Sequence, residues 1–107
     1  GCKVFIAAAG MAAHLAGAVA AHSTKPVIGI PIESGGMGGI DSLLSTAMMP
    51  PGVPVATVAV GKSGAKNSAI LAVQILATSD DELAQKLKDY KSNMREEVLE
   101  KDKKLNS

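Results

Sequence analysis

Three short, nearly uninterrupted apolar runs alternate with helix-like segments, and this alternation constrains the fold more than any other feature of the sequence. The runs are Lys3–Ala9, Pro26–Ile32 and Val55–Gly61, and each has the length and the β-branched content of a buried strand. Pro31 lacks an amide donor and is predicted to mark the end of the second strand. Strands of this kind between helices are typical of a parallel sheet that is covered on both faces. The sequence therefore predicts an α/β fold of three layers, in which a parallel sheet lies between two layers of helices. The crossovers between its strands should be right-handed.

Helix signals lie between and after the strands. Residues 11–22 are rich in Ala and lack Pro, which favours a helix. Asp41 is predicted to cap a short helix that ends before Pro50 and Pro51. Residues 65–77 are apolar nearly all round, so we expect this helix to be buried on most sides.

The last segment has a different character. Ser79, Asp80, Asp81 and Glu82 form a capping-box pattern that predicts the start of a final helix. Apolar residues then recur every three or four positions, at Leu83, Leu87, Tyr90, Met94 and Val98. We expect this stripe to pack on the body or on a neighbouring subunit, and the tail of residues 100–107 to fray. The sequence thus divides into a partial domain over residues 1–78 and a C-terminal helix over 79–107.

Composition limits what such a chain binds. Aromatic residues make up 2% of the 107 residues, so a core of small aliphatic side chains is expected to need neighbouring subunits. The net charge of +1 gives no electrostatic case for nucleic acid or an anionic membrane. No apolar run reaches the ~18 residues that a membrane span needs. The N-terminus lacks the basic region of a signal peptide.

Cys2 is the single cysteine, so neither an intrachain disulfide nor a cysteine metal site is expected. This pattern agrees with a reducing cytoplasm. Its strand-like surroundings predict an inert, buried thiol.

Ligands of open parallel sheets bind beyond the carboxyl ends of the strands. Residues 9–15, 33–41 and 61–64 are expected there. Gly10 permits a close approach of the backbone to a ligand, and the following helix start favours an anion. His14 lies in that first turn, where it either reaches the crevice or caps and packs an Ala-rich helix. The sequence contains no metal-ligand cluster, no paired catalytic carboxylates and no Ser-His-Asp pattern.

Four blocks carry a resemblance to a known family. The segment AAAGMAAHLAG is similar to that family's Ala-Gly-Ala-Gly-Gly-Ala-Ala-His-Leu-Pro-Gly loop. The segments PVIGIPIES, GGIDSLLSTAMMPPGVPVATVAVG and KSGAKNSAILAVQILA resemble its next blocks in the same order, over residues 3–78. The chain thus resembles the N5-carboxyaminoimidazole ribonucleotide mutases, class I of the phosphoribosylaminoimidazole carboxylase catalytic subunits. Met11, Ala16 and Ala47-Met48 depart from the family pattern.

The resemblance implies a flavodoxin-like domain, a cytoplasmic homo-octamer, and a purine-biosynthesis reaction without metal or organic cofactor. The family moves a carboxylate from the exocyclic nitrogen of a small-molecule nucleotide to ring carbon C4, giving 4-carboxy-5-aminoimidazole ribonucleotide. Such chemistry needs a dry pocket that retains carbon dioxide and a proton carrier near neutral pH. The resemblance assigns the catalytic role to His14. It assigns substrate contacts to residues at the strand ends and the next helix start: Ala9, Gly10, Met11, Ala13, Leu15, Ser34, Asp41 and Ser42.

Two loops of the family have no counterpart in these 107 residues: Gly-Ser-x-Ser-Asp, which binds the ribose phosphate, and Ser-Ala-His-Arg-Thr. We therefore expect a mutase subunit whose first part lies outside this sequence, and no measurable activity from residues 1–107 alone. One alternative is a non-catalytic assembly or binding module of the same fold. Another is an unrelated flavodoxin-like nucleotide-binding domain.

Overall fold

The computed structural model describes residues 2–10, 14–33 and 38–106. The chain divides into two compact units, residues 1–72 and residues 73–107. The first unit contains the whole sheet, and the second contains the end of one helix and the final helix. The elements follow one another along the chain as β1 (Phe5–Ala9), α1 (His14–His22), β2 (Val27–Pro31), α2 (Ile40–Ala47), β3 (Ala56–Thr57), α3 (Lys62–Ala77) and α4 (Asp81–Asn106).

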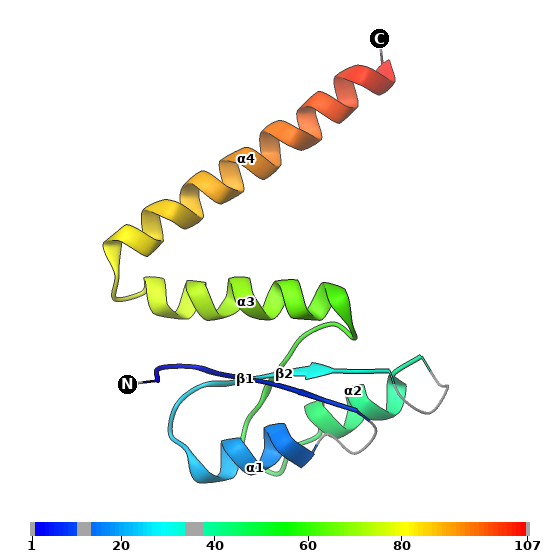
Figure 1. Ribbon diagram of the computed structural model, residues 1–107, viewed down its shortest axis with the longest axis vertical. Helices are drawn as coiled ribbons and strands as arrows, with labels where there is room; N and C mark the ends of the chain where they lie inside the picture. Colours follow the sequence, from blue (N-terminus) through cyan, green and yellow to red (C-terminus); the bar gives the residue numbers. More distant parts are fainter. Residues whose placement is uncertain (1, 11–13, 34–37, 107) are drawn as a thin grey trace. The chain divides into compact units, whose positions relative to one another are not determined.

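The predicted parallel sheet is confirmed. Its three strands lie in the order β1-β2-β3, and both pairings are parallel. Phe5 pairs with Val27 at one end of the β1–β2 ladder, and Ala9 pairs with Pro31 at the other. Helices α1 and α2 lie on one face of this sheet, and the first part of α3 runs along the opposite face (Figure 1). The arrangement is the predicted α/β fold with helices on both faces.

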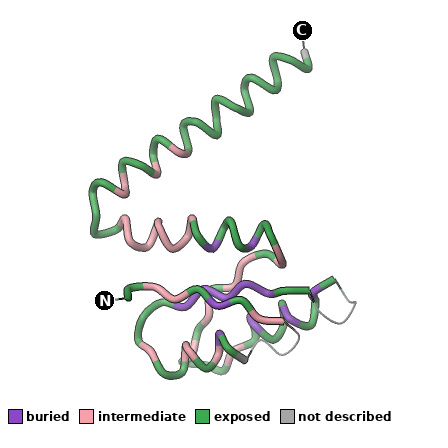
Figure 2. The backbone as a smooth tube through the Cα atoms, in the orientation of Figure 1, coloured by how far each residue is buried: buried purple, intermediate pink, exposed green. Residues whose placement is uncertain are grey.

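The centre of the first unit is β2. All five of its residues are buried, and Figure 2 shows burial concentrated around it. Gly29 is needed in this strand because a Cβ there would lie 2.5 Å from Cγ2 of Thr46 and 2.9 Å from Cγ1 of Val55. The missing side chain therefore lets α2 approach the sheet closely.

The strands begin and end close to where the apolar runs predict. Pro31 is the last residue of β2, as expected from its missing amide donor. By contrast, β3 has two residues rather than the predicted seven of Val55–Gly61. Pro54 cannot donate to the ladder at its start. Two isolated hydrogen bonds continue the contact with β2 beyond the end of β3. The Val58 amide donates to Gly29 O at 3.2 Å, and the Gly61 amide donates to Pro31 O at 2.9 Å.

Two helix expectations are wrong. Asp41 does not cap α2, because the helix begins at Ile40 and its cap is Gly39, which has a φ of 85°. A residue with positive φ at this position favours glycine over aspartate. Helix α3 begins at Lys62, and only Gly64 and Ser68 of its residues are buried, so the expected burial on most sides is absent in this chain.

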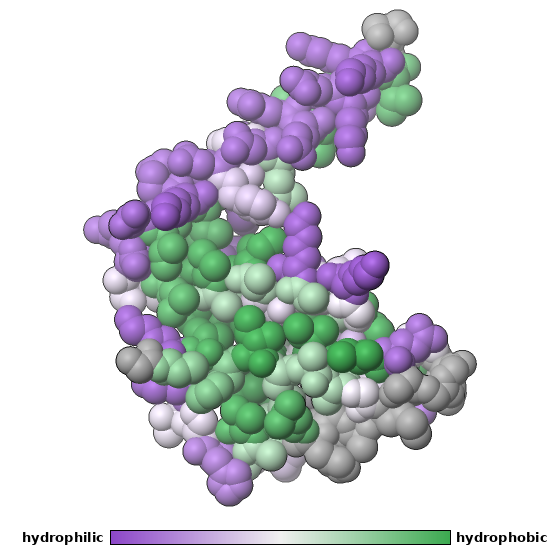
Figure 3. All heavy atoms as spheres, viewed as in Figure 1, coloured by the Kyte–Doolittle hydropathy of each residue, from purple (hydrophilic) through white to green (hydrophobic). Residues whose placement is uncertain are grey.

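The second unit is dominated by α4, whose cap is Asp80 rather than Ser79. The Leu83 amide donates to Oδ1 of Asp80 at 3.1 Å, which satisfies one free amide of the first turn. The helix continues to Asn106, so the structure extends it through most of the tail, whose expected fraying stays a prediction. Within the predicted stripe, Met94 and Val98 are exposed. Figure 3 shows that hydrophilic side chains cover most of the visible face of α4.

Cys2 is exposed, which corrects the expectation of a buried thiol. The reason is that β1 begins only at Phe5, so Cys2 precedes the sheet. Its Sγ donates to Val4 O at 3.2 Å.

Candidate functional site

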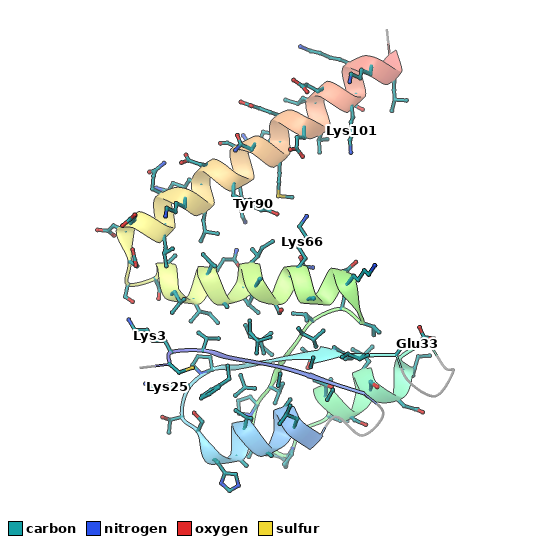
Figure 4. The ribbon with its side chains drawn as sticks, in the orientation of Figure 1. Lys3, Lys25, Glu33, Lys66, Tyr90 and Lys101 are labelled. Atoms are coloured by element: carbon teal, nitrogen blue, oxygen red, sulfur yellow. The ribbon has the colours of Figure 1, made fainter. Side chains whose placement is uncertain are left out.

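The carboxyl ends of β1 and β2 leave the sheet at the same edge. The amide of Ile32 donates to Ala9 O at 3.0 Å, one step beyond the last ladder pair. Gly10 and Glu33 follow these two residues directly. Figure 4 shows Glu33 at this edge, whereas Lys3 and Lys25 lie together at the opposite edge. We call the first the carboxyl edge and the second the amino edge.

The first predicted segment reaches the carboxyl edge through α1. His14 is the first residue of this helix, and Ala16, which is buried in the core with Ala7, holds the helix start against the sheet. Leu15 is 56% exposed. Met11, Ala13 and Ser34, together with the side chain of His14, lie outside the described residues. The backbone therefore brings the start of α1 to the edge at which Gly10 leaves β1.

The second predicted segment reaches the same edge through α2. A Cβ at Gly39 would lie 2.5 Å from Cγ1 of Val60, so the cap of α2 packs closely on the connection between β3 and α3. Ser42 in the first turn is fully buried, and its hydroxyl donates to Ile32 O at 2.8 Å. Asp41 beside it is exposed. Of the α2 residues that we expected to contact substrate, Asp41 is exposed and Ser42 is already hydrogen-bonded inside the fold.

The third predicted segment joins the other two. Gly61 has a φ of 78°, and its amide donates to Pro31 O at 2.9 Å, so the chain turns into α3 beside the end of β2. Gly64 packs so closely on Ala59 that a Cβ would overlap the Ala59 carbonyl. Lys62, the first residue of α3, is exposed at this turn. The described residues of all three predicted segments thus lie at the carboxyl edge.

A separate cavity of about 370 Å³ lies at the amino edge. Ser23, Lys25 and Gly52 are among its lining residues. The Ser23 hydroxyl accepts a hydrogen bond from the Lys25 amide at 3.0 Å. Because open parallel sheets bind their ligands beyond the carboxyl ends of their strands, we place the candidate site at the carboxyl edge and not in this cavity.

The described residues also bear on whether the chain has a metal site or a membrane-spanning helix. Among residues 2–10, 14–33 and 38–106, no three His, Cys, Asp or Glu side chains come together as a metal site would require. In the part of the chain that the structure describes, no helix has both the length and the apolar character to span a membrane.

The comparison with protein families decides the assignment. A family model described as AIR carboxylase matches residues 1–97. The chain belongs to the AIR carboxylase family. This match spans the complete sheet and most of α4, so it covers all three segments of the carboxyl edge.

Individual members of the AIR carboxylase family show the same likeness. The N5-carboxyaminoimidazole ribonucleotide mutase of Escherichia coli K12 is 53% identical over 100 residues, which cover 94% of this chain and 59% of the relative. The mutase of Bacillus subtilis is 54% identical over 94% of this chain and 62% of the relative. That of Saccharolobus solfataricus is 56% identical over 92% of this chain and 61% of the relative. The chain thus spans about three fifths of the length of these curated relatives.

Some contacts at the carboxyl edge were not singled out from the sequence. The peptide of Ile32 and the side chain of Val60 both connect predicted segments. Neither residue type indicates a functional role in the sequence. The Ile32 peptide acts through backbone atoms, which every residue possesses. The Gly39–Val60 contact joins residues 21 positions apart, and only the fold reveals it.

Proposed function

We propose that the protein converts N5-carboxyaminoimidazole ribonucleotide into 4-carboxy-5-aminoimidazole ribonucleotide, a step of purine biosynthesis. The observation that carries this proposal is the match to AIR carboxylase over residues 1–97, which includes every segment of the carboxyl edge. The names of the mutase relatives support the substrate. Because those relatives are longer, we assign the ribose-phosphate contacts to loops outside these 107 residues.

The proposed reaction is an isomerisation. The bond between the exocyclic nitrogen and the carboxylate carbon breaks, and a new bond forms between that carbon and C4 of the ring. C4 loses its proton and the nitrogen gains one, so atoms and charge balance without an added reagent. His14 is the proposed proton carrier, since imidazole exchanges protons near neutral pH.

The chain's small residues suit the migrating group. Gly10 has no side chain to keep the carboxylate from the backbone, and the free amides at the start of α1 favour a negative charge. We assign Ala9, Ala13 and Leu15 to the wall around the imidazole. A set of small and apolar residues keeps water away from carbon dioxide while it is free. Met11, Ser34 and Asp41 complete the proposed contacts, whereas the Ser42 hydroxyl, which we expected to contact substrate, donates to Ile32 O.

We also propose a cytoplasmic homo-octamer. Ile40, Leu44 and Met48 are spaced four residues apart at α2, and all three are exposed in this chain. The end of α4 exposes Met94, Val98, Leu99 and Leu105. Apolar side chains aligned on two helices favour contact with further copies of the chain, in a closed symmetric assembly. The cytoplasm is the compartment that suits a biosynthetic nucleotide and an unpaired thiol.

The activity is tested on the whole protein with substrate labelled with carbon-13 in the migrating carboxylate. Carbon-13 NMR should show the label leaving nitrogen and joining the ring. His14→Asn is expected to lower kcat roughly 100-fold or more, because it removes the proton carrier. The matched control is His22→Asn at the other end of α1, where kcat should stay within about twofold.

Two results would count against this proposal. If the whole wild-type protein does not move the label, the mutase assignment is wrong. If that inactive protein still assembles, the non-catalytic assembly module would be the better description. If His14→Asn and His22→Asn lower kcat equally, His14 is not the proton carrier.

A further inference from the structure

We propose that Ser42 is a positioning residue of the candidate site, and that it fixes the first turn of α2 relative to Ala9 and Gly10 through the peptide of Ile32. The activity part of this inference rests on the proposed function. The structural part stands on the contacts of the described residues alone.

A chain of hydrogen bonds joins three elements at the carboxyl edge. The Thr46 hydroxyl donates to Ser42 O at 2.7 Å inside α2. The Ser42 hydroxyl donates to Ile32 O at 2.8 Å, and the Ile32 amide donates to Ala9 O at 3.0 Å. One peptide beyond β2 is therefore bonded to β1 on its amide side and to α2 on its carbonyl side. We call this series the Thr46–Ala9 chain.

The link to α2 depends on the Ser42 hydroxyl. Ile32 is 41% exposed, so its packing holds the segment only in part. Ser42 is 0% exposed, and the hydrogen bond from its hydroxyl to the Ile32 carbonyl is partly buried, so the hydroxyl is the donor that α2 supplies to this carbonyl. Removing the hydroxyl leaves that carbonyl without this donor. The first turn of α2 then loses its direct bond to the end of β2.

The position of that first turn matters for the proposed chemistry. Asp41 precedes Ser42 in the turn and is exposed, while Gly10 follows the other end of the Thr46–Ala9 chain. Catalytic groups act only when they are held close to the productive geometry, and a small displacement is enough to lower the rate. Ser42 therefore sets the distance between two walls of the candidate site without touching the substrate.

The test compares two buried serines in the whole protein. Ser68 is 1% exposed, and its hydroxyl donates to Ala65 O at 2.7 Å within its own helix. Ser42→Ala and Ser68→Ala thus remove similar bonds, and we expect similar falls in Tm. Only Ser42→Ala is expected to lower kcat/KM, by about tenfold or more, whereas Ser68→Ala should leave it within about twofold.

A second measurement does not depend on activity. Amide hydrogen exchange of Ile32 reports its bond to Ala9. We expect Ser42→Ala to speed this exchange by about tenfold, because the peptide loses its opposite support, and Ser68→Ala to leave it unchanged. Thr46→Val, which removes the next bond of the chain, should give a smaller change in the same direction and serves if Ser42→Ala does not fold.

The outcomes separate the two proposals. If the wild-type protein has no mutase activity, the proposed function fails, and the exchange of Ile32 still decides whether the Thr46–Ala9 chain holds the edge together. Unchanged exchange at Ile32 in both Ser42→Ala and Thr46→Val would overturn the inference. So would equal losses of kcat/KM in Ser42→Ala and Ser68→Ala, since Ser42 would then be an ordinary structural serine.

Discussion

Strand β2 and helix α4 depend on their surroundings to very different degrees. Each of the five residues of β2 is buried, and the strand pairs with β1 on one side and β3 on the other. Helix α4 has 26 residues, and none of those that the structure describes in it is buried within the chain. The conformation of β2 thus follows from contacts inside the first unit. The exposed apolar residues of α4, among them Met94 and Val98, remain available for contacts that this single chain does not supply.

Local interactions account for α4 in the absence of burial. Asp80 caps its first turn, and acidic residues at its start and lysines at its end agree with the helix dipole. Lys86 Nζ lies 3.7 Å from Oε1 of Glu82. Each such interaction contributes less than the burial of one large aliphatic side chain. Substitutions in the two elements should therefore differ in size in a predictable order.

The largest effect is expected at Ile28, the largest fully buried side chain of the chain's described part. Ile28→Ala should lower the free energy of unfolding by about 2–5 kcal/mol, because it removes packed methyl groups and leaves a cavity. Val98→Ala in α4, where Val98 is 62% exposed within the chain, is the comparison truncation and should cost at most about 0.5 kcal/mol in the unassembled chain. Urea unfolding followed by circular dichroism measures both. If the two substitutions lower the free energy of unfolding by similar amounts, Val98 is buried in solution against a partner.

The next effect is expected at Gly29. Gly29→Ala should lower the free energy of unfolding by about 1–3 kcal/mol, because the added methyl group meets Thr46 and Val55. The matched control is Gly17→Ala in α1, where the nearest atom is the terminal methyl of Met49 at 3.2 Å. There the gain in helix propensity, about 0.5–1 kcal/mol, opposes a contact that can yield. Equal destabilisation by the two substitutions would contradict the close approach of α2 to β2.

A smaller effect is expected at the start of α4. Asp80→Ala removes the acceptor of the Leu83 amide and should cost about 1 kcal/mol. Asp80→Asn keeps an acceptor and should recover most of that loss. Thermal unfolding and helix content by circular dichroism measure the difference. If Asp80→Ala changes neither, the helix start is held by contacts other than its cap.

The smallest effect is expected from the ion pair of Glu82 and Lys86. Both side chains are largely exposed, so Lys86→Gln should change the free energy of unfolding by less than about 0.5 kcal/mol. Urea unfolding at low and high salt checks this value, and the small difference should shrink as salt screens the pair. A loss comparable with that of Ile28→Ala would mean that this face of α4 is covered in the assembled protein.

The same contrast explains what the sequence predicts well. The three strands and their parallel pairing follow from the nearly uninterrupted apolar runs, because burial on two faces demands a continuous apolar segment. The meeting of three segments at one edge follows from that parallel order. Gly10 and the start of α1 could therefore be placed at the candidate site before the structure was known.

Details that depend on contacts between distant residues were not predictable. Asp41 is a residue type that often caps helices, yet the cap of α2 is Gly39, which has a φ of 85° and packs closely on Val60. Ser42 has the chemistry of a substrate ligand, yet its hydroxyl donates to Ile32 O. Both differences arise where the start of α2 packs against other parts of the first unit, and the distance between two elements is a property of tertiary packing. The extension of α4 to Asn106 was missed for another reason, since a charged tail gives little indication of where a helix ends.

We propose above all that the carboxyl edge of the sheet binds the nucleotide. The most direct test is amide hydrogen exchange of the whole protein with and without 4-carboxy-5-aminoimidazole ribonucleotide. The nucleotide is predicted to slow exchange at Gly10, Ile32 and Gly39, and to leave Lys25 and Gly52 beside the amino-edge cavity unchanged. Slower exchange confined to Lys25 and Gly52, with none at the carboxyl edge, would contradict the account.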